Sequence, residues 1–174
     1  MPTIFSIPGS LRSGSSNHNI LKFLGTLVPD NFNYTIYDSL ATIPPFDPGL
    51  DNDTPPQPVT KLRNLIANTN AAIICTPEYA FGVPGQLKNA LDWLVSNGTL
   101  VDKPVALITA SSSGEYAHPS LLRTLGALSA NVIEEASLLA PFIRSKMDSE
   151  GNITDEDLKA ALENAFRVLL NKID

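Results

Sequence analysis

The chain is predicted to fold as a doubly wound α/β domain, with a five-stranded parallel sheet between two layers of helices. Strand patterns alternate with helical patterns five times along the sequence. Two of the strand segments, residues 71–76 and 103–110, are apolar almost throughout, as is typical of strands buried on both faces. Parallel strands need crossover helices, and right-handed crossovers give a three-layer sandwich. We expect residues 1–174 to form a single domain.

The first half of the chain contains two predicted strands and two predicted helices. Residues 3–7 (TIFSI) are β-rich and are followed by a Pro-Gly pair that ends a strand. Residues 33–38 (NYTIYD) form the second strand, and residues 39–59 hold six prolines, which predicts a long surface loop. The first helix begins near residue 17 and stops at Pro29, and a second helix follows the proline-rich loop. Apolar residues at helical spacing mark their inward faces: Ile20, Leu21, Leu24 and Leu27 in the first, and Val59, Leu62, Leu65 and Ile66 in the second.

The second half continues the alternation. Helices are predicted over residues 86–95 and 120–128, with residues 103–110 as a strand between them and residues 131–140 (NVIEEASLLA) as the fifth strand. The last helix is predicted to begin at Thr154, because Asp157 three residues later makes a start that is similar to a capping box. The inward faces of the first and last of these three helices are Leu87, Ala90, Leu91 and Leu94, then Leu158, Ala161, Leu162, Ala165 and Leu169.

Composition and charge narrow the classes of function. The formal net charge is −6 and no lysine or arginine cluster is present, which argues against nucleic acid as a partner. The 43% hydrophobic content is that of a soluble globular protein, and no apolar run approaches the ~20 residues that span a bilayer. The single cysteine excludes an internal disulfide framework and indicates the reducing cytoplasm.

Three loops of unusual composition are predicted to lie at the carboxyl ends of the strands, where ligands bind in folds of this class. They are residues 8–16, 77–85 and 111–119. The first combines Gly9 and Gly14 with several serines and Arg12, directly before a helix. Free N–H groups at a helix start, hydroxyl groups and a guanidinium together suit a phosphate. A serine-capped helix start without a ligand is the alternative interpretation.

The spacing of the two glycines in the first loop restricts the kind of phosphate. Gly9 and Gly14 are spaced as in the loop of nucleotide triphosphatases, but Ser15 occupies the position of the lysine. The loop also lacks the glycine pattern that binds dinucleotides. A terminal monophosphate is therefore predicted here. In the second loop, Tyr79 and Phe81 offer aromatic faces to a flat polar ring, although a rigid turn with aromatics packed on the core would have the same composition.

The first two loops together are similar to those of a known family. The segment GSLRSGSSN, followed at this distance by PEYAFGVPGQLKNALDWL, resembles the NADPH-dependent FMN reductases, a flavodoxin-like group that includes quinone, azo and chromate reductases. The resemblance extends over nearly the whole chain, including LATIPPFD. It implies that FMN is bound by three sets of residues: Ser10, Arg12, Ser15, Ser16 and Asn17 at the phosphate; Pro77, Glu78, Tyr79, Ala80 and Phe81 at the ring; and Ser111, Ser112, Ser113 and Gly114 in the third loop.

Two positions depart from the family pattern. The family usually has asparagine after Pro-Glu-Tyr, where this chain has Ala80, and the third loop usually carries a Gly-Gly pair near the position of Ala117 and His118. Both departures concern the choice of substrate and the flavin potential more than flavin binding itself.

Five other residues were considered for chemistry. Cys75 is expected to be an inert packed thiol, since no second cysteine can resolve it. His18 and His118 lack the spacing of metal ligands, and His118 is expected to be an ordinary loop histidine, with a substrate contact as the alternative. Glu78 is expected to have a salt bridge or a helix end as its partner. Trp93 either completes the core or anchors a dimer.

The function that follows from the resemblance is that of an FMN-dependent NAD(P)H oxidoreductase. Hydride would pass from NADPH or NADH through FMN to a small acceptor such as a quinone, an azo compound, free flavin or a metal oxyanion. The alternatives are an electron carrier or redox sensor without turnover, and a fold relative that binds no flavin. The resemblance further implies a homodimer or homotetramer, with the helix of residues 86–95 near its interface.

Overall fold

The structure, a computed structural model, describes residues 1–173. Its centre is one parallel sheet in the order β2-β1-β3-β4-β5, with β6 also pairing with β4. The strands are β1 (Thr3–Pro8), β2 (Asn33–Ile36), β3 (Ala71–Thr76), β4 (Pro104–Ala110), β5 (Asn131–Val132) and β6 (Leu138–Ala140). The chain begins in the middle of the sheet, moves to the edge at β2 and then crosses back beyond β1. This is the predicted doubly wound, flavodoxin-like topology.

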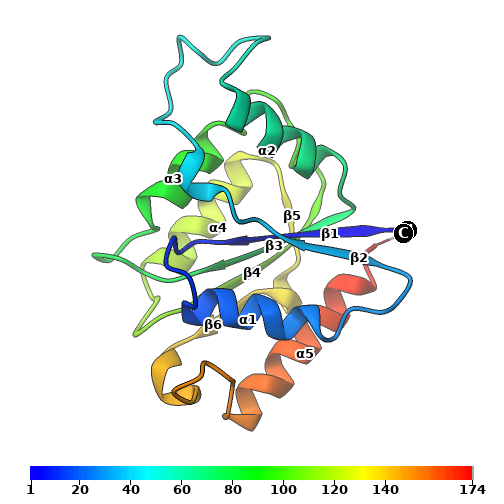
Figure 1. The fold of residues 1–174 in the computed structure, drawn as a ribbon, viewed down its shortest axis with the longest axis vertical. Coiled ribbons are helices and arrows are strands. Elements are labelled where there is room, and N and C mark those ends of the chain that lie inside the picture. Colours follow the sequence, from blue (N-terminus) through cyan, green and yellow to red (C-terminus); the bar gives the residue numbers. More distant parts are fainter. Residues whose placement is uncertain (174) are drawn as a thin grey trace.

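Helices cover both faces of the sheet (Figure 1). One face is covered by α2 (Gln57–Ala67), α3 (Gly85–Asp92) and α4 (Ala117–Ala127), and the other by α1 (Ser16–Gly25) and α5 (Glu156–Leu170). Alternate strand residues supply the two apolar cores between these layers, so that Phe5 and Ile74 pack toward α2 and α3 whereas Ile4 and Ile73 pack toward α1 and α5. Every residue of β3 is buried, which confirms the interpretation of its continuous apolar run.

The predicted fifth strand is interrupted, which corrects the expectation of one continuous strand over residues 131–140. A short 3-10 helix, Glu134–Ala136, separates β5 from β6, and both pieces run parallel to β4. Its two glutamates are exposed while Ile133 and Ala136 are buried. The two pieces lie along β4 at different heights, because β5 pairs with its start and β6 with its end.

The start of α5 also differs from the prediction. The N-cap is Asp155, whose carboxylate accepts a hydrogen bond of 2.7 Å from the backbone N–H of Leu158, rather than Thr154. Both sequence positions carry a good capping side chain, and the backbone of residue 155 is the one with the extended conformation that a cap requires. The predicted apolar stripe of this helix is confirmed at Leu158, Leu162, Ala165 and Leu169, all of which are buried.

The proline-rich segment after β2 is irregular, as predicted, except for one 3-10 turn at Leu40–Thr42. It is attached to α3 by side-chain amides. Gln86 donates to the carbonyls of Leu40 and Ile43, at 2.9 and 2.8 Å, and Asn89 both accepts from Phe46 N–H and donates to Pro44 O. Loop carbonyls that a proline-rich chain cannot pair by itself are thereby satisfied.

Trp93 completes this attachment, and the interpretation that it anchors a dimer is wrong. Its side chain is fully buried, its indole N–H donates to Pro44 O at 2.8 Å, and its ring meets Phe46 edge to face at 5.0 Å. An exposed aromatic would be needed for an interface. Trp93 lies off the inward stripe of α3 because the proline-rich segment, and not the sheet, packs against it.

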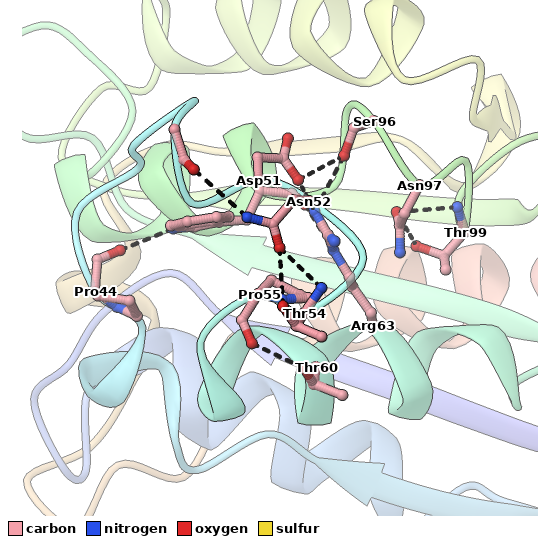
Figure 2. A network of polar contacts seen from close by, with 12 residues as sticks. Pro44, Asp51, Asn52, Thr54, Pro55, Thr60, Arg63, Ser96, Asn97 and Thr99 are labelled. Atoms are coloured by element: carbon pink, nitrogen blue, oxygen red, sulfur yellow. Dashed lines mark hydrogen bonds and ion pairs between the residues drawn. The ribbon is translucent and has the colours of Figure 1, made fainter.

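A partly buried ion pair holds a later part of the same segment (Figure 2). Arg63 of α2 donates to Asp51 at 2.7 Å and to Ser96 at 3.1 Å, and both of its donor nitrogens also reach Trp93 O. The side chains of Arg63 and Asp51 are 11% and 10% exposed. No helix in the described part of the chain combines the length and apolarity that a bilayer crossing requires.

Candidate functional site

A cleft of about 320 Å³ opens at the carboxyl ends of the strands. The sheet order places the switch in winding direction between β1 and β3, and the loops that follow these two strands form the cleft. Its volume lies within the range of roughly 300–1,000 Å³ that is usual for small-molecule sites. Its lining residues are Ser10, Arg12, Ser15, Ser16, Asn17, Pro77, Glu78, Tyr79, Ala110, Ser111, Ser112, Ile143 and Arg144.

The first loop leaves β1 in close contact with β3. Gly9 N–H donates to Cys75 O at 2.7 Å, and a Cβ built on Gly9 would lie 2.3 Å from Thr76 Oγ1. Only glycine therefore permits this approach. Gly14 has a φ of +67° and turns the chain into α1, where Ser15 is the N-cap and accepts from His18 N–H at 3.2 Å. The serine-cap interpretation is thus correct for Ser15, and it leaves the other donors of the loop free.

Those remaining donors fit a phosphate. Within residues 1–173, the N–H groups of Ser16 and Asn17 in the first turn of α1 have no hydrogen-bond partner, and the guanidinium of Arg12 has none either. Ser10 and Ser15 lie at the floor of the cleft with 7% and 3% of their surface exposed. Unpaired N–H groups at the positive end of a ten-residue helix, with hydroxyls and an arginine beside them, form an anion site.

Hydrogen bonds join the three loops into one rim. Ser10 Oγ and the Tyr79 hydroxyl are 3.1 Å apart, which connects the first loop to the second. Glu78 N–H donates to Ser111 Oγ at 3.1 Å, which connects the second loop to the third. The predicted residues of different loops are therefore held at fixed separations across the cleft.

Glu78 serves a helix end, as predicted. Its carboxylate accepts from Tyr116 and Ala117 N–H at 2.8 and 2.7 Å, and from Gly114 N–H at 3.4 Å. Ala117 begins α4 and Tyr116 is its N-cap residue, whose side chain makes no capping hydrogen bond. A carboxylate at this position satisfies free donors and complements the helix dipole, so that Glu78 positions the third loop and is not arranged as a general base.

The second loop contains a strained turn. Tyr79 and Gly82 exchange two backbone hydrogen bonds of 3.0 and 2.9 Å, and the residues between them, Ala80 and Phe81, both have left-handed backbone angles, with φ of 47° and 60°. Turns of this shape favour asparagine and glycine, since each other L-residue costs about 1 kcal/mol or more there. The turn presents the ring of Phe81 outward, 75% exposed and edge to face with Tyr116 at 5.1 Å.

Four predicted residues do not line the cleft itself. Ala80 and Phe81 lie on the outer turn just described, and Ser113 and Gly114 lie beyond Ser112 on the third loop. Gly114 has a structural requirement, because its φ is +93° and a Cβ there would approach Leu139 Cδ1 to 2.6 Å. These residues shape the rim, whereas Ser111 and Ser112 reach the interior.

Three lining residues are absent from the sequence-based prediction: Ala110, the last residue of β4, and Ile143 and Arg144. Ile143 and Arg144 come from the segment after β6, which also ends at the carboxyl edge of the sheet. The rule that ligand loops follow parallel strands would have included this segment. The predicted strand of residues 131–140 ends where β6 ends, but the segment after it has no glycine or serine cluster to mark it as a ligand loop.

Cys75 and His118 have structural roles. Cys75 is completely buried, burial raises the pKa of its thiol well above the usual range, and its Sγ donates to Asn17 Oδ1 at 3.5 Å. His118 lies in the first turn of α4 and pairs through Nδ1 with Thr109 Oγ1 at 2.8 Å, and burial lowers its pKa. Burial also lowers the pKa of His18. Within residues 1–173, no group of three or more potential ligands could hold a metal ion.

A larger hollow, of about 470 Å³, lies between α2 and the strands β1 and β2. It is lined by side chains such as Thr3, Phe5 and Leu65, and it lies at the amino-terminal part of the strands, away from the loops just described. Its lining includes Gln57, the first residue of α2, but no serine-rich loop and no arginine. We therefore assign the site to the smaller cleft, where unpaired donors converge.

Comparison with known proteins agrees with this geometry. The model of the family described as "NADPH-dependent FMN reductase" matches residues 2–144. The chain is 31% identical over 160 residues to a quinone reductase of Escherichia coli strain K12, a match that covers 88% of this chain and 85% of that protein. It is also 31% identical over 163 residues to a 2-hydroxy-1,4-benzoquinone reductase of a Burkholderia species, covering 90% and 88%.

A solved structure has a similar fold. The flavoenzyme NAD(P)H:(acceptor) oxidoreductase FerB of Paracoccus denitrificans superposes with a TM-score of 0.81 at 25% identity, covering 98% of this chain and 96% of that one. The family match extends over the first and second loops, the third loop and the residues up to Arg144. The chain belongs to the NADPH-dependent FMN reductase family and is an FMN-dependent NAD(P)H oxidoreductase.

Proposed function

We propose that the cleft holds FMN with its phosphate on the first loop and its ring beside the second and third loops. Ser10, Arg12 and Ser15 would bind the phosphate through hydroxyl and guanidinium groups, with the free N–H groups of Ser16 and Asn17. The observation that carries this assignment is the set of unpaired donors at the start of α1 in a protein whose net charge is −6.

The chain's own residues bind and orient, and they perform no acid–base step. Bound FMN would supply the hydride and electron transfer between the nicotinamide and the acceptor. The Glu78 carboxylate is occupied by the N–H groups of α4, and the Cys75 thiol is buried. Pro77, Tyr79 and Ser111 line the cleft and would lie beside the ring.

We propose that the preferred acceptors are flat and aromatic, such as quinones. The exposed faces of Tyr79, Phe81 and Tyr116 stand at the rim of the cleft, at 53%, 75% and 55% exposure. Aromatic rings of this kind gain by stacking or edge contact with another ring. Ala80 contributes no side-chain hydrogen bond, so that a small polar acceptor would gain little from this turn.

Steady-state oxidation of NADPH and of NADH by the FMN-loaded protein tests the proposal. One cleft that donor and acceptor use in turn predicts ping-pong kinetics, seen as parallel double-reciprocal lines with 1,4-benzoquinone. Phe81→Ala should lower kcat/KM for the quinone several-fold and leave kcat/KM for chromate unchanged. A protein that is reduced once by NADPH and does not turn over would instead be an electron carrier or sensor.

We further propose a homodimer or homotetramer. The aromatic rim, together with Leu11 at 56% and Phe142 at 69% exposure, offers more large apolar surface than scattered single residues would. Sedimentation velocity at micromolar concentration should give a species heavier than the 18.7 kDa chain. A single species of that mass would contradict the assembly.

Two further properties are proposed on the same grounds. One sheet with both faces covered by helices supports a single FMN-binding domain over the whole chain. A lone cysteine that is buried supports residence in the cytoplasm, with NADPH or NADH and a small acceptor as partners. Cell fractionation with activity assays would check the location.

A further inference from the structure

A fourth loop reaches the cleft and brings a second arginine to it. Residues 141–147 follow β6, and from them Ile143 and Arg144 line the cleft that also contains Ser10 and Arg12. A second hollow of about 240 Å³ adjoins the cleft, and it too is lined by Arg12, Ser16 and Arg144. Both arginines therefore lie where the two hollows meet, beside the start of α1.

The backbone that carries Arg144 is held at both ends. Phe142 N–H donates to Ser112 O at 3.3 Å and Ile143 N–H donates to Ser111 O at 3.1 Å, which joins the segment to the third loop. Phe142 has a left-handed φ of 54° and begins the 3-10 helix Ile143–Lys146. At the other end Thr154 N–H donates to Lys146 O at 2.9 Å. A guanidinium on such a fixed segment has a restricted reach.

Neither arginine has a partner within residues 1–173. Arg12 and Arg144 donate no side-chain hydrogen bond there and form no ion pair. The carboxylates around the two hollows are engaged elsewhere: Glu78 accepts from the start of α4, Asp148 accepts from Glu150 N–H, Asn152 N–H and the Asn152 amide, and Glu150 accepts from the same amide. Two cations thus border one cleft with no protein anion bound to them.

We propose that Arg144 is a second guanidinium ligand of the FMN phosphate, acting together with Arg12. This inference rests on the proposed FMN site. A phosphate monoester carries a charge of about −1.5 to −2 at neutral pH, and the first loop supplies only one cationic side chain in a protein of net charge −6. A second guanidinium balances the dianion and adds a further fork of donors to its oxygens.

The test compares FMN with riboflavin, which has the same ring and no phosphate. Apo-protein carrying Arg144→Gln is titrated with each flavin, and binding is followed by the change in flavin fluorescence. The dissociation constant for FMN should rise about tenfold or more, and that for riboflavin should stay within twofold of wild type. The dissociation constant of Arg144→Lys for FMN should lie between those of the wild type and Arg144→Gln. The matched control is Arg123→Gln, on the exposed face of α4, which should not change FMN binding.

Several outcomes would overturn the inference. Equal weakening of FMN and riboflavin would mean that Arg144 only shapes the loop, and unchanged FMN binding would mean that the phosphate does not contact it. Unchanged FMN binding counts against the proposal even if Arg144→Gln raises the KM for NADPH relative to that for NADH. Binding to the wild type distinguishes failure of this inference from failure of the proposed FMN site. If the wild type binds both flavins equally, it has no phosphate site. If it prefers FMN and Arg144→Gln does not change that preference, the phosphate site exists without Arg144.

Discussion

Arg63 differs from Arg12 and Arg144 in whether the protein itself pairs its guanidinium. Arg63 is largely buried and paired with Asp51 and Ser96 (Figure 2), and it also donates to the carbonyl of Trp93. Arg12 and Arg144 lie at the carboxyl edge of the sheet and have no partner within residues 1–173. Only the donors of Arg63 attach a loop to the scaffold, whereas those of Arg12 and Arg144 have no partner in the described part of the chain.

The difference indicates how to separate a structural cation from one that serves a ligand. The donors of Arg63 are used up by the chain, so that removing it should affect folding and leave ligand binding alone. The donors of Arg12 are unused, so that removing it should affect an anion and leave folding alone.

Arg63→Met should destabilise the protein the most. The substitution keeps the aliphatic length but removes charge-assisted hydrogen bonds and leaves Asp51 without its partner, which we expect to cost about 2–3 kcal/mol. For a chain of this size this is a fall in Tm on the order of 5–10 °C. Lys88→Met removes only the exposed pair with Asp92 and is the control, with an expected cost below about 1 kcal/mol. Arg63→Met should also keep the wild-type preference for FMN over riboflavin.

The same pair should give the protein a specific acid sensitivity. Hydrogen bonds from Arg63 hold the pKa of Asp51 below its ordinary value. A pKa that is lower in the folded state means that the stabilisation is present above the unfolded value, about 3.9, and is lost as pH falls through the folded value. Urea unfolding of wild type and Arg63→Met between pH 7 and pH 3 should therefore show a difference that shrinks only below about pH 4. A constant difference over this range would exclude the link to Asp51.

Arg12→Ala should have the next largest effect, and on binding only. Loss of one charge-assisted contact with the phosphate is expected to cost about 1.5–3 kcal/mol, or roughly tenfold or more in FMN affinity. The Tm of the apo-protein should stay within a degree or two of wild type, because Arg12 contacts nothing that the fold requires. A fall in Tm as large as that of Arg63→Met would remove the distinction between the two groups.

Ala80→Asn should give a smaller, stabilising effect. Asparagine tolerates the left-handed angle that Ala80 adopts, and relief of this strain should add about 0.5–1 kcal/mol to the free energy of unfolding. The new amide can also donate a hydrogen bond at the rim, so that the flavin midpoint potential, or the ratio of quinone to chromate activity, should shift. If unfolding, potentiometry and both activities all remain as in wild type, position 80 has no influence on the site.

Most of the fold could be predicted because it depends on local pattern. The continuous apolar run of β3 and the stripes of α1, α2, α3 and α5 each identify their own buried face. The fifth strand was predicted as continuous because the break occurs at Glu134–Ala136, where the two glutamates remain exposed and no glycine or proline marks the interruption.

The candidate site was predicted as far as its loops carry a distinctive composition. The first loop was identified from its glycines and serines, and the structure adds what composition cannot contain, namely which of its donors are unpaired. Arg144 was missed because an isolated arginine after a short strand has no local signature. Of the two interpretations of Trp93, the one in which it completes the core is confirmed, but its hydrogen-bond partner, a carbonyl of Pro44 49 positions away in the sequence, has no local signature.

The most direct test of the account is the affinity of the wild-type apo-protein for FMN and for riboflavin, measured by calorimetry under the same buffer and salt. We expect FMN to bind at least tenfold more tightly, since only FMN engages the unpaired donors of Arg12 and α1. Added salt should weaken FMN binding and leave riboflavin binding nearly unchanged. Equal affinities at low salt would contradict the claim that the unpaired arginines form a phosphate site.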